Sequence, residues 1–68
     1  MQLSARNQLK GTVTEIKPGP ISTEVTIDVG GTEIVSSITS GSAEALHLKV
    51  GDSAVAIIKA SAVMVGKE

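Results

Sequence analysis

Two short stretches at opposite ends of the chain combine a cation with small hydrogen-bond donors. Ser4-Ala5-Arg6-Asn7 places the only arginine beside a hydroxyl and an amide, and Lys59-Ala60-Ser61 places a lysine beside a hydroxyl. A tetrahedral oxyanion needs this combination, because cations supply charge and neutral donors supply directed hydrogen bonds. The two stretches together predict a protein that binds a small anion.

Each stretch also has an ordinary explanation. The first could be a polar N-terminal arm, and a lysine that ends an apolar strand commonly extends to solvent. The functional interpretation rests on chemistry: the guanidinium of Arg6 cannot lose its charge and presents a rigid fork of donors. The small residues after Lys59 would let an anion approach backbone N–H groups closely.

A third group of donors, Thr39-Ser40-Gly41-Ser42, precedes the one segment that resembles a helix. Ser40 or Ser42 is expected to cap that helix. Three of these four residues carry hydroxyls, which is more than capping requires. A loop of this composition that opens a helix also presents N–H groups to an anion.

Residues for catalysis or for holding a metal ion are sparse. The chain has no cysteine, and its only histidine, His47, has no serine or carboxylate at a telling spacing, so it is expected at a surface or helix end. The seven carboxylates are scattered over predicted polar faces and turns, which favours a solvated surface over an acid–base pair. No phosphate-loop or dinucleotide motif is present. The sequence predicts no catalytic residue and no direct metal ligand.

Alternation of apolar and polar residues predicts the strands that position these groups. Ile21–Val29 alternates with period two, Gly30-Gly31 follows as a hairpin turn, and Thr32–Ile38 continues as the next strand. Asn7–Lys17 is an earlier strand, in which Gly11 predicts a bulge or a sharp bend.

The second half of the chain predicts one short helix and two more strands. The helix is expected over Ser42–Leu46, with Glu44 in its first turn, and Val50–Asp52 is a turn. Ser53–Lys59 is a strand with apolar residues on both faces, and Ala62–Val65 is a short final strand. This order predicts an all-β domain over residues 1–68, an oligonucleotide/oligosaccharide-binding (OB)-like five-stranded barrel with one short helix between the third and fourth strands.

Composition indicates that one copy of the chain does not bury enough surface to be stable alone. A domain of 68 residues buries only about 60% of the surface that its unfolded chain exposes. Disulfides are excluded and aromatic residues are absent, yet the chain is 41% hydrophobic. We therefore expect a tight homo-oligomer. A net charge of -1 argues against a general nucleic-acid or membrane binder, and the lack of a signal peptide or a membrane span gives a cytoplasmic expectation.

The chain resembles the molbindin (Mop) family of molybdate-binding TOBE domains. The resemblance rests on the opening Ser4-Ala5-Arg6-Asn7-Gln8-Leu9-Lys10-Gly11, and it is supported by Glu24-Val25, Ile38-Thr39-Ser40 and Ile57-Ile58-Lys59-Ala60. It covers essentially the whole chain, with the motifs in the family's order and spacing. It implies an OB-like barrel that exchanges elements within a dimer, and three dimers that form a cytoplasmic homohexamer.

The resemblance also implies a ligand and the residues that hold it. Molybdate or tungstate would bind between subunits, with no organic cofactor. The implied contacts are Ser4, Arg6, Lys59 and the amide of Ala60, with Thr39 and Ser42 from the loop before the helix. A second class of anion site is implied near a threefold axis, with Pro20, Ile21 and Ser22 as candidates. The proline-rich Lys17-Pro18-Gly19-Pro20 departs from the family pattern there, and His47 stands where a glycine is common.

The expected function is storage or homeostasis of molybdate, without catalysis. The alternative is a regulatory anion-sensing module that acts through a protein partner. A nucleic-acid-binding OB domain is a third hypothesis, and the acidic pI and the absence of aromatic stacking residues disfavour it.

Overall fold

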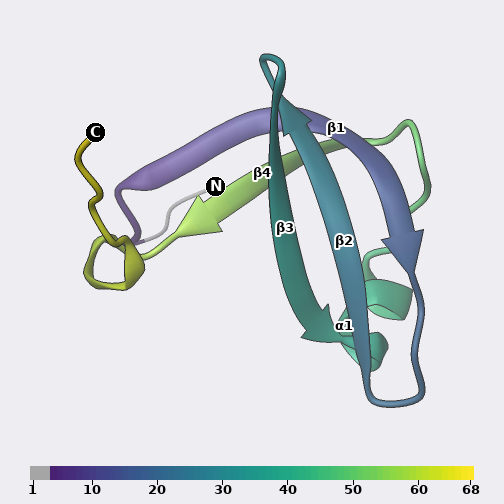
Figure 1. Cartoon of the computed structure of the whole chain (residues 1–68). Coiled ribbons are helices and arrows are strands. Elements are labelled where there is room, and N and C mark those ends of the chain that lie inside the picture. The colour runs from purple at the N-terminus through teal and green to yellow at the C-terminus, as the bar shows by residue number, and fades with distance from the viewer. Residues whose placement is uncertain (1–3) are drawn as a thin grey trace.

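The computed structural model describes residues 4–68, which form an antiparallel four-stranded sheet with one short helix (Figure 1). The elements in order are β1 (Asn7–Lys17), β2 (Ser22–Val29), β3 (Thr32–Thr39), α1 (Ser40–Ala45), β4 (Ser53–Ile58) and one turn of 3-10 helix (Ala60–Ala62). The strands lie side by side as β3-β2-β1-β4. The all-β class and the place of the helix after the third strand are as the sequence predicts. No helix within residues 4–68 has the length and apolarity to cross a bilayer.

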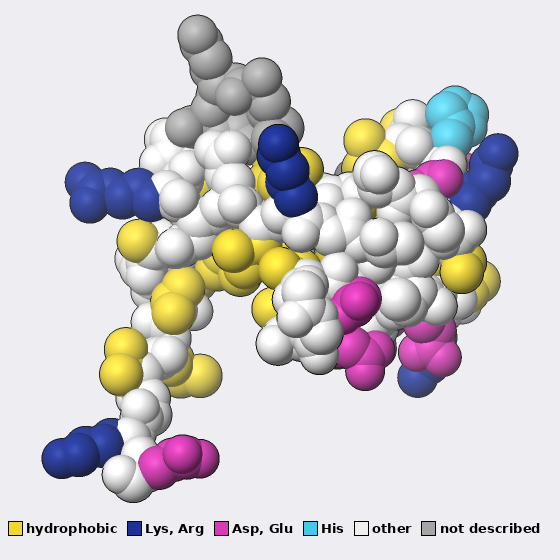
Figure 2. All heavy atoms as spheres, turned by 90° about the horizontal axis from the view of Figure 1, so that it is seen from above, with side chains coloured by type: hydrophobic (Ala, Val, Ile, Leu, Met, Phe, Trp, Pro, Cys, Tyr) yellow, Lys and Arg dark blue, Asp and Glu magenta, His cyan; other side chains and the backbone are white. Residues whose placement is uncertain are grey.

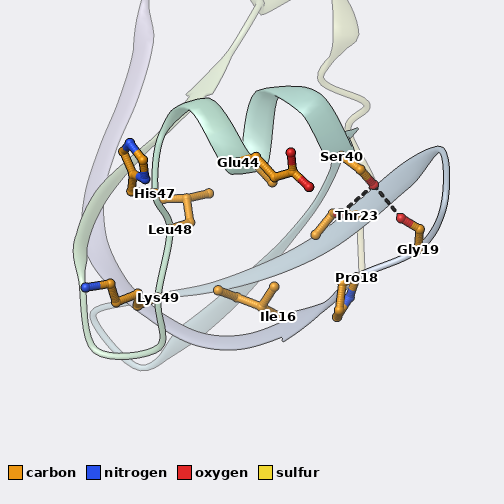
Figure 3. A pocket seen from close by; sticks show the side chains of 10 residues that line it. Ile16, Pro18, Gly19, Thr23, Ser40, Glu44, His47, Leu48 and Lys49 are labelled. Atoms are coloured by element: carbon orange, nitrogen blue, oxygen red, sulfur yellow. Dashed lines mark hydrogen bonds between the residues drawn. The ribbon is translucent and has the colours of Figure 1, made fainter.

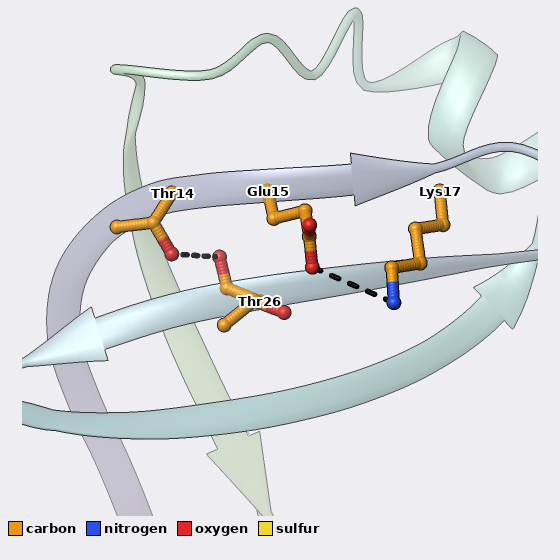
Figure 4. Close-up of polar contacts among 4 residues, drawn as sticks. All are labelled: Thr14, Glu15, Lys17 and Thr26. Atoms are coloured by element: carbon orange, nitrogen blue, oxygen red, sulfur yellow. Dashed lines mark hydrogen bonds and ion pairs between the residues drawn. The ribbon is translucent and has the colours of Figure 1, made fainter.

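Strand β1 is long and curved, and two different strands pair with its two halves (Figure 1). Its first half, up to Thr12, pairs with β4, and its second half, from Thr12 onward, pairs with β2. The register of the second half shifts between Val13 and Glu15, so the irregularity lies at Thr14 and not at Gly11. Figure 4 shows this region, where the Thr14 hydroxyl donates to the Thr26 carbonyl at 3.4 Å.

Gly11 is needed for a different reason, the close approach of β1 to β2. A Cβ atom on Gly11 would lie 2.3 Å from the Asp28 carbonyl oxygen and 2.8 Å from Ile27 Cγ2. No real side chain fits at those distances, so the curve of β1 over β2 depends on a residue without a Cβ.

The core is small, as the composition predicts. Within residues 4–68, four apolar residues are buried in the protomer, namely Val13, Val25, Ile27 and Ala56. Six partly buried apolar residues pack around them, namely Ile16, Val29, Ile34, Ile38, Leu48 and Ala54. Ile57 on β4 stays 44% exposed, so the outer face of this strand is only partly covered within one chain.

The β2–β3 hairpin confirms the predicted turn. Gly30 and Gly31 have φ of +60° and +95°, which glycine adopts without the steric penalty of a side chain. The Gly31 N–H donates to Asp28 Oδ1 at 3.1 Å and closes the turn.

The helix differs from its prediction in its first residue, in its N-cap and in the position of its acidic residue. It begins at Ser40, two residues early, and its cap is Thr39, whose hydroxyl oxygen accepts the Ser42 N–H at 3.1 Å. The predicted caps were wrong because the Ser40 hydroxyl bonds Gly19 instead, a contact that local sequence does not show. With this start, Glu44 falls outside the first turn.

The fifth strand, expected at residues 62–65, is not present. The 3-10 turn over Ala60–Ala62 is followed by a segment without regular structure through residue 68, and β4 itself ends at Ile58. Figure 1 shows this C-terminal segment leading away from the sheet, so it meets no strand edge of its own chain. Met64 and Val65 are 94% and 92% exposed as a result.

Replacing Gly11 by alanine should destabilise the protein by about 1–3 kcal/mol, because the new methyl group forces β1 away from β2. Urea unfolding at fixed protomer concentration measures this change. Gly41→Ala is the matched control, since nothing lies within 4 Å of its added Cβ and alanine favours a helix. A Gly11→Ala protein as stable as the wild type would contradict the close approach.

Candidate anion-binding site

The register of β1 against β4 brings the two cationic stretches together. Asn7 pairs with Ile58 in the antiparallel ladder, so Arg6, just before Asn7, and Lys59, just after Ile58, lie at the same end of the two strands. Ser4 and Ala60 adjoin them in sequence, and all four residues are exposed. We call Ser4, Arg6, Lys59 and Ala60 the Arg6–Lys59 group.

Asn7 fastens this end of the sheet and is not a member of the group. Its side-chain amide donates to the Ile58 carbonyl at 3.2 Å, across the same pair of residues that sets the register. The amide therefore has a structural role at this end of the sheet.

The Thr39–Ser42 group, which we define as these two residues, forms at the junction of β3 and α1. The Thr39 hydroxyl oxygen accepts the Ser42 N–H at 3.1 Å, and the Thr39 hydroxyl donates to Ser42 Oγ at 2.7 Å. A hydroxyl carries one proton, so that of Thr39 is already in use. The Ser42 hydroxyl proton meets no acceptor among residues 4–68 and remains available to solvent or a ligand.

The segment Pro20-Ile21-Ser22 lies beside the Thr39–Ser42 group. Ser22 pairs with Thr39 at the end of the β2–β3 ladder, and the Ser40 N–H donates to the Ile21 carbonyl at 2.9 Å. From the sequence, this segment and the Thr39–Ser42 group were predicted as separate features, whereas in the fold they are neighbours.

The two groups lie at opposite ends of β1 (Figure 1). The Arg6–Lys59 group flanks the first residue of β1. The helix α1 lies near the other end of β1, where Ile16, Pro18 and Ala43 line one pocket. One protomer therefore does not bring all the predicted anion contacts to one place.

His47 lies on the rim of that pocket, an open space of ≈ 480 Å³ shown in Figure 3. It is exposed and has φ of +52°, an uncommon conformation for a residue with a side chain, just after the end of α1. Within the part of the chain that the structure describes, no three His, Cys, Asp or Glu side chains are placed to hold a metal ion.

Charged side chains form no continuous basic surface on the face seen in Figure 2. The blue cations stand apart from one another, in keeping with a net charge of -1. Anion binding must therefore depend on local contacts rather than on the field of the whole molecule.

Comparison with known proteins decides the family. A family model described as the TOBE domain matches residues 3–65, and a probable molybdenum-pterin-binding protein of Haemophilus influenzae is 52% identical over 69 residues, 100% of each chain. The chain belongs to the molbindin (Mop) family of TOBE domains.

Two solved molbindin-type structures share the fold. A molybdate-binding protein from Sporomusa ovata superposes with a TM-score of 0.94 at 40% identity, covering 98% of this chain and 100% of that chain. The cytoplasmic molybdate-binding protein ModG, in a crystal form with molybdate bound, gives a TM-score of 0.84 at 51% identity. That comparison covers 88% of this molbindin chain and 43% of the ModG chain, so this chain spans less than half of ModG.

Sequence reasoning did not foresee how Ser40 and Thr23 act near the Thr39–Ser42 group. Ser40 was considered as a helix cap and as one of the donors before the helix, and Thr23 was not singled out, although it is 3% exposed and its hydroxyl lies 2.8 Å from Ser40 Oγ. A signal was present, because Thr23 is a polar residue at an inward position of an alternating strand.

Replacing Thr39 by alanine should destabilise the protein by about 1 kcal/mol, because the helix loses its cap. Thr39→Ser keeps the accepting oxygen and should retain most of the stability. Urea unfolding of the two variants without added anion makes the comparison. Equal losses in both variants would show that the hydroxyl does not cap α1.

Proposed function

We propose that this protein binds molybdate and tungstate for storage or homeostasis, at sites shared between subunits of a homo-oligomer. The observation that carries the proposal is the pairing of Asn7 with Ile58, which places Arg6 and Lys59 at the same end of β1 and β4. The relatives described above, whose names and titles refer to molybdenum or molybdate, indicate which anion these donors suit.

The Arg6–Lys59 group has the chemistry that a tetrahedral dianion requires. Two cations balance two negative charges, and the guanidinium offers paired N–H donors in a fixed plane. The Ser4 hydroxyl and the Ala60 N–H would add neutral donors. Molybdate, tungstate and sulfate share charge and shape, so the size of the completed cavity would separate the two metal oxyanions from sulfate.

A second copy of the chain would complete the shell of donors. The Thr39–Ser42 group lies too far along β1 to reach an anion at Arg6 in the same protomer, and the Ser42 hydroxyl still has a proton to donate. We place the anion between the Arg6–Lys59 group of one chain and the Thr39–Ser42 group of its neighbour. Pro20, Ile21 and Ser22 remain the candidates for a second class of site.

Exposed apolar surface supports the oligomer. An open groove of ≈ 440 Å³ lies between β4 and the β2–β3 hairpin, and apolar side chains such as Ile27, Ile38 and Ile57 line it. The C-terminal segment carries exposed Met64 and Val65 away from the body, as the extended arm in Figure 2 shows. A groove and an arm that are both apolar fit one another in a second copy. We propose a homohexamer built from three such dimers.

Isothermal titration with molybdate, tungstate and sulfate tests the ligand. Molybdate and tungstate should bind saturably, and each should raise the melting temperature as its concentration rises above Kd. Sulfate should bind at least about tenfold more weakly, a difference of roughly 1.4 kcal/mol. Equal affinities for all three anions would contradict a size-selective cavity.

Removing either cation should weaken molybdate binding. Arg6→Ala or Lys59→Ala loses a charge-assisted hydrogen bond, about 1.5–3 kcal/mol, and therefore about tenfold to a hundredfold in affinity. Arg6→Lys should recover only part of the loss, because a point charge does not reproduce the fork. Lys10→Ala is the matched control, since it removes the same charge from an exposed position on β1.

Titration and melting of the anion-free variants separate binding from stability. The anion-free variants should be as stable as the wild type or more stable, because repulsion between clustered cations is relieved. If Lys59→Ala lowers the stability of the anion-free protein and leaves affinity intact, Lys59 is a structural lysine at a strand end.

A further inference from the structure

Ser40 is the centre of a short chain of hydrogen bonds beside the Thr39–Ser42 group (Figure 3). Its hydroxyl donates to the Gly19 carbonyl at 2.6 Å and lies 2.8 Å from Thr23 Oγ1. Because a hydroxyl has one proton and Ser40 gives it to Gly19, the Thr23 hydroxyl must donate to Ser40. Thr23 is 3% exposed, so water cannot readily replace Ser40 as its acceptor.

Within residues 4–68, Ser40 makes two hydrogen bonds to the loop between β1 and β2. Pro18 and Pro20 have no N–H, so the carbonyl groups of the loop are its main means of bonding to the body. The Gly19 carbonyl accepts from the Ser40 side chain, and the Ile21 carbonyl accepts from the Ser40 N–H at 2.9 Å. Ser40 thus holds the loop with both its side chain and its backbone.

Ser40 also lies in sequence between Thr39 and Ser42, the two residues that the proposed function assigns to the anion. Ser40 follows Thr39 directly, and Thr39 bonds Ser42 through both its accepting oxygen and its proton. Thr39 and Ser42 are exposed, and α1, which begins at Ser40, has no buried residue. Besides the pairing of Thr39 with Ser22 in the β2–β3 ladder, the hydrogen bonds of Ser40 hold this segment in place.

We propose that Ser40 is a positioning residue, which fixes the Thr39–Ser42 group against the β1–β2 loop so that the Ser42 hydroxyl is preorganised for the anion. This inference rests on the proposed function. Ser40 does not contact the anion. It acts by holding donors that would otherwise have to be ordered when the anion binds, and prior ordering raises affinity.

A double-mutant cycle tests the inference by isothermal titration with molybdate. Ser40→Ala should weaken binding about fivefold to tenfold, the effect of losing one neutral hydrogen bond. In a Ser42→Ala background, the same change should weaken binding about twofold or less, because the donor that Ser40 positions is gone. Ser40→Thr keeps the hydroxyl and should restore affinity. Ser37→Ala, an exposed serine on β3, is the control and should have no effect.

Thr23→Val provides a second variant if Ser40→Ala does not fold. This change removes the donor to Ser40 and leaves the Ser40–Gly19 bond, so the loss of molybdate affinity should be smaller than for Ser40→Ala. The loss should again shrink in the Ser42→Ala background. Equal loss in both backgrounds would overturn the positioning role and leave the proposed function standing. No binding of molybdate by the wild type would overturn both.

Discussion

The pairing of β1 with two different strands is the constraint on which the rest of the structure depends. β4 pairs with its first half and β2 with its second, and the strand curves between them where Gly11 approaches Asp28. The first pairing places Arg6 and Lys59 at the same end of β1 and β4. The second joins β2 to the other half of β1, and β2 in turn pairs with β3, which places Ser22 beside Thr39. The length of β1 therefore separates the two groups of donors.

The small core of the protomer bears on how an anion site between chains would be completed. With four buried apolar side chains in the part of the chain that the structure describes, the protomer leaves an apolar groove and an apolar arm exposed. A fold of this size gains stability by association. If the anion lies where chains meet, the contacts that stabilise the assembly also bring donors from two chains to one ligand, and the charge of the anion offsets the repulsion between the cations.

Sequence periodicity was sufficient for the parts of the fold that are local. Alternation located β1, β2 and β3, a run that is apolar on both faces located β4, and Gly30-Gly31 located the hairpin turn. Antiparallel pairing of the first and fourth strands places Arg6 and Lys59 at the same end of the sheet. The failures were all tertiary. Thr39 caps the helix, because the Ser40 side chain bonds a distant loop. The bulge lies at Thr14. Residues 62–65 have no partner strand within residues 4–68.

Mixing two defective chains tests most directly whether the site is shared. Arg6→Ala and Ser42→Ala proteins would be unfolded together, refolded together and titrated with molybdate. If each site takes Arg6 from one chain and Ser42 from its neighbour, random pairing restores both residues in about a quarter of the sites. A shared site predicts a fraction of sites with wild-type affinity in the mixture and none in either variant alone. A mixture that binds no better than the separate variants would contradict it.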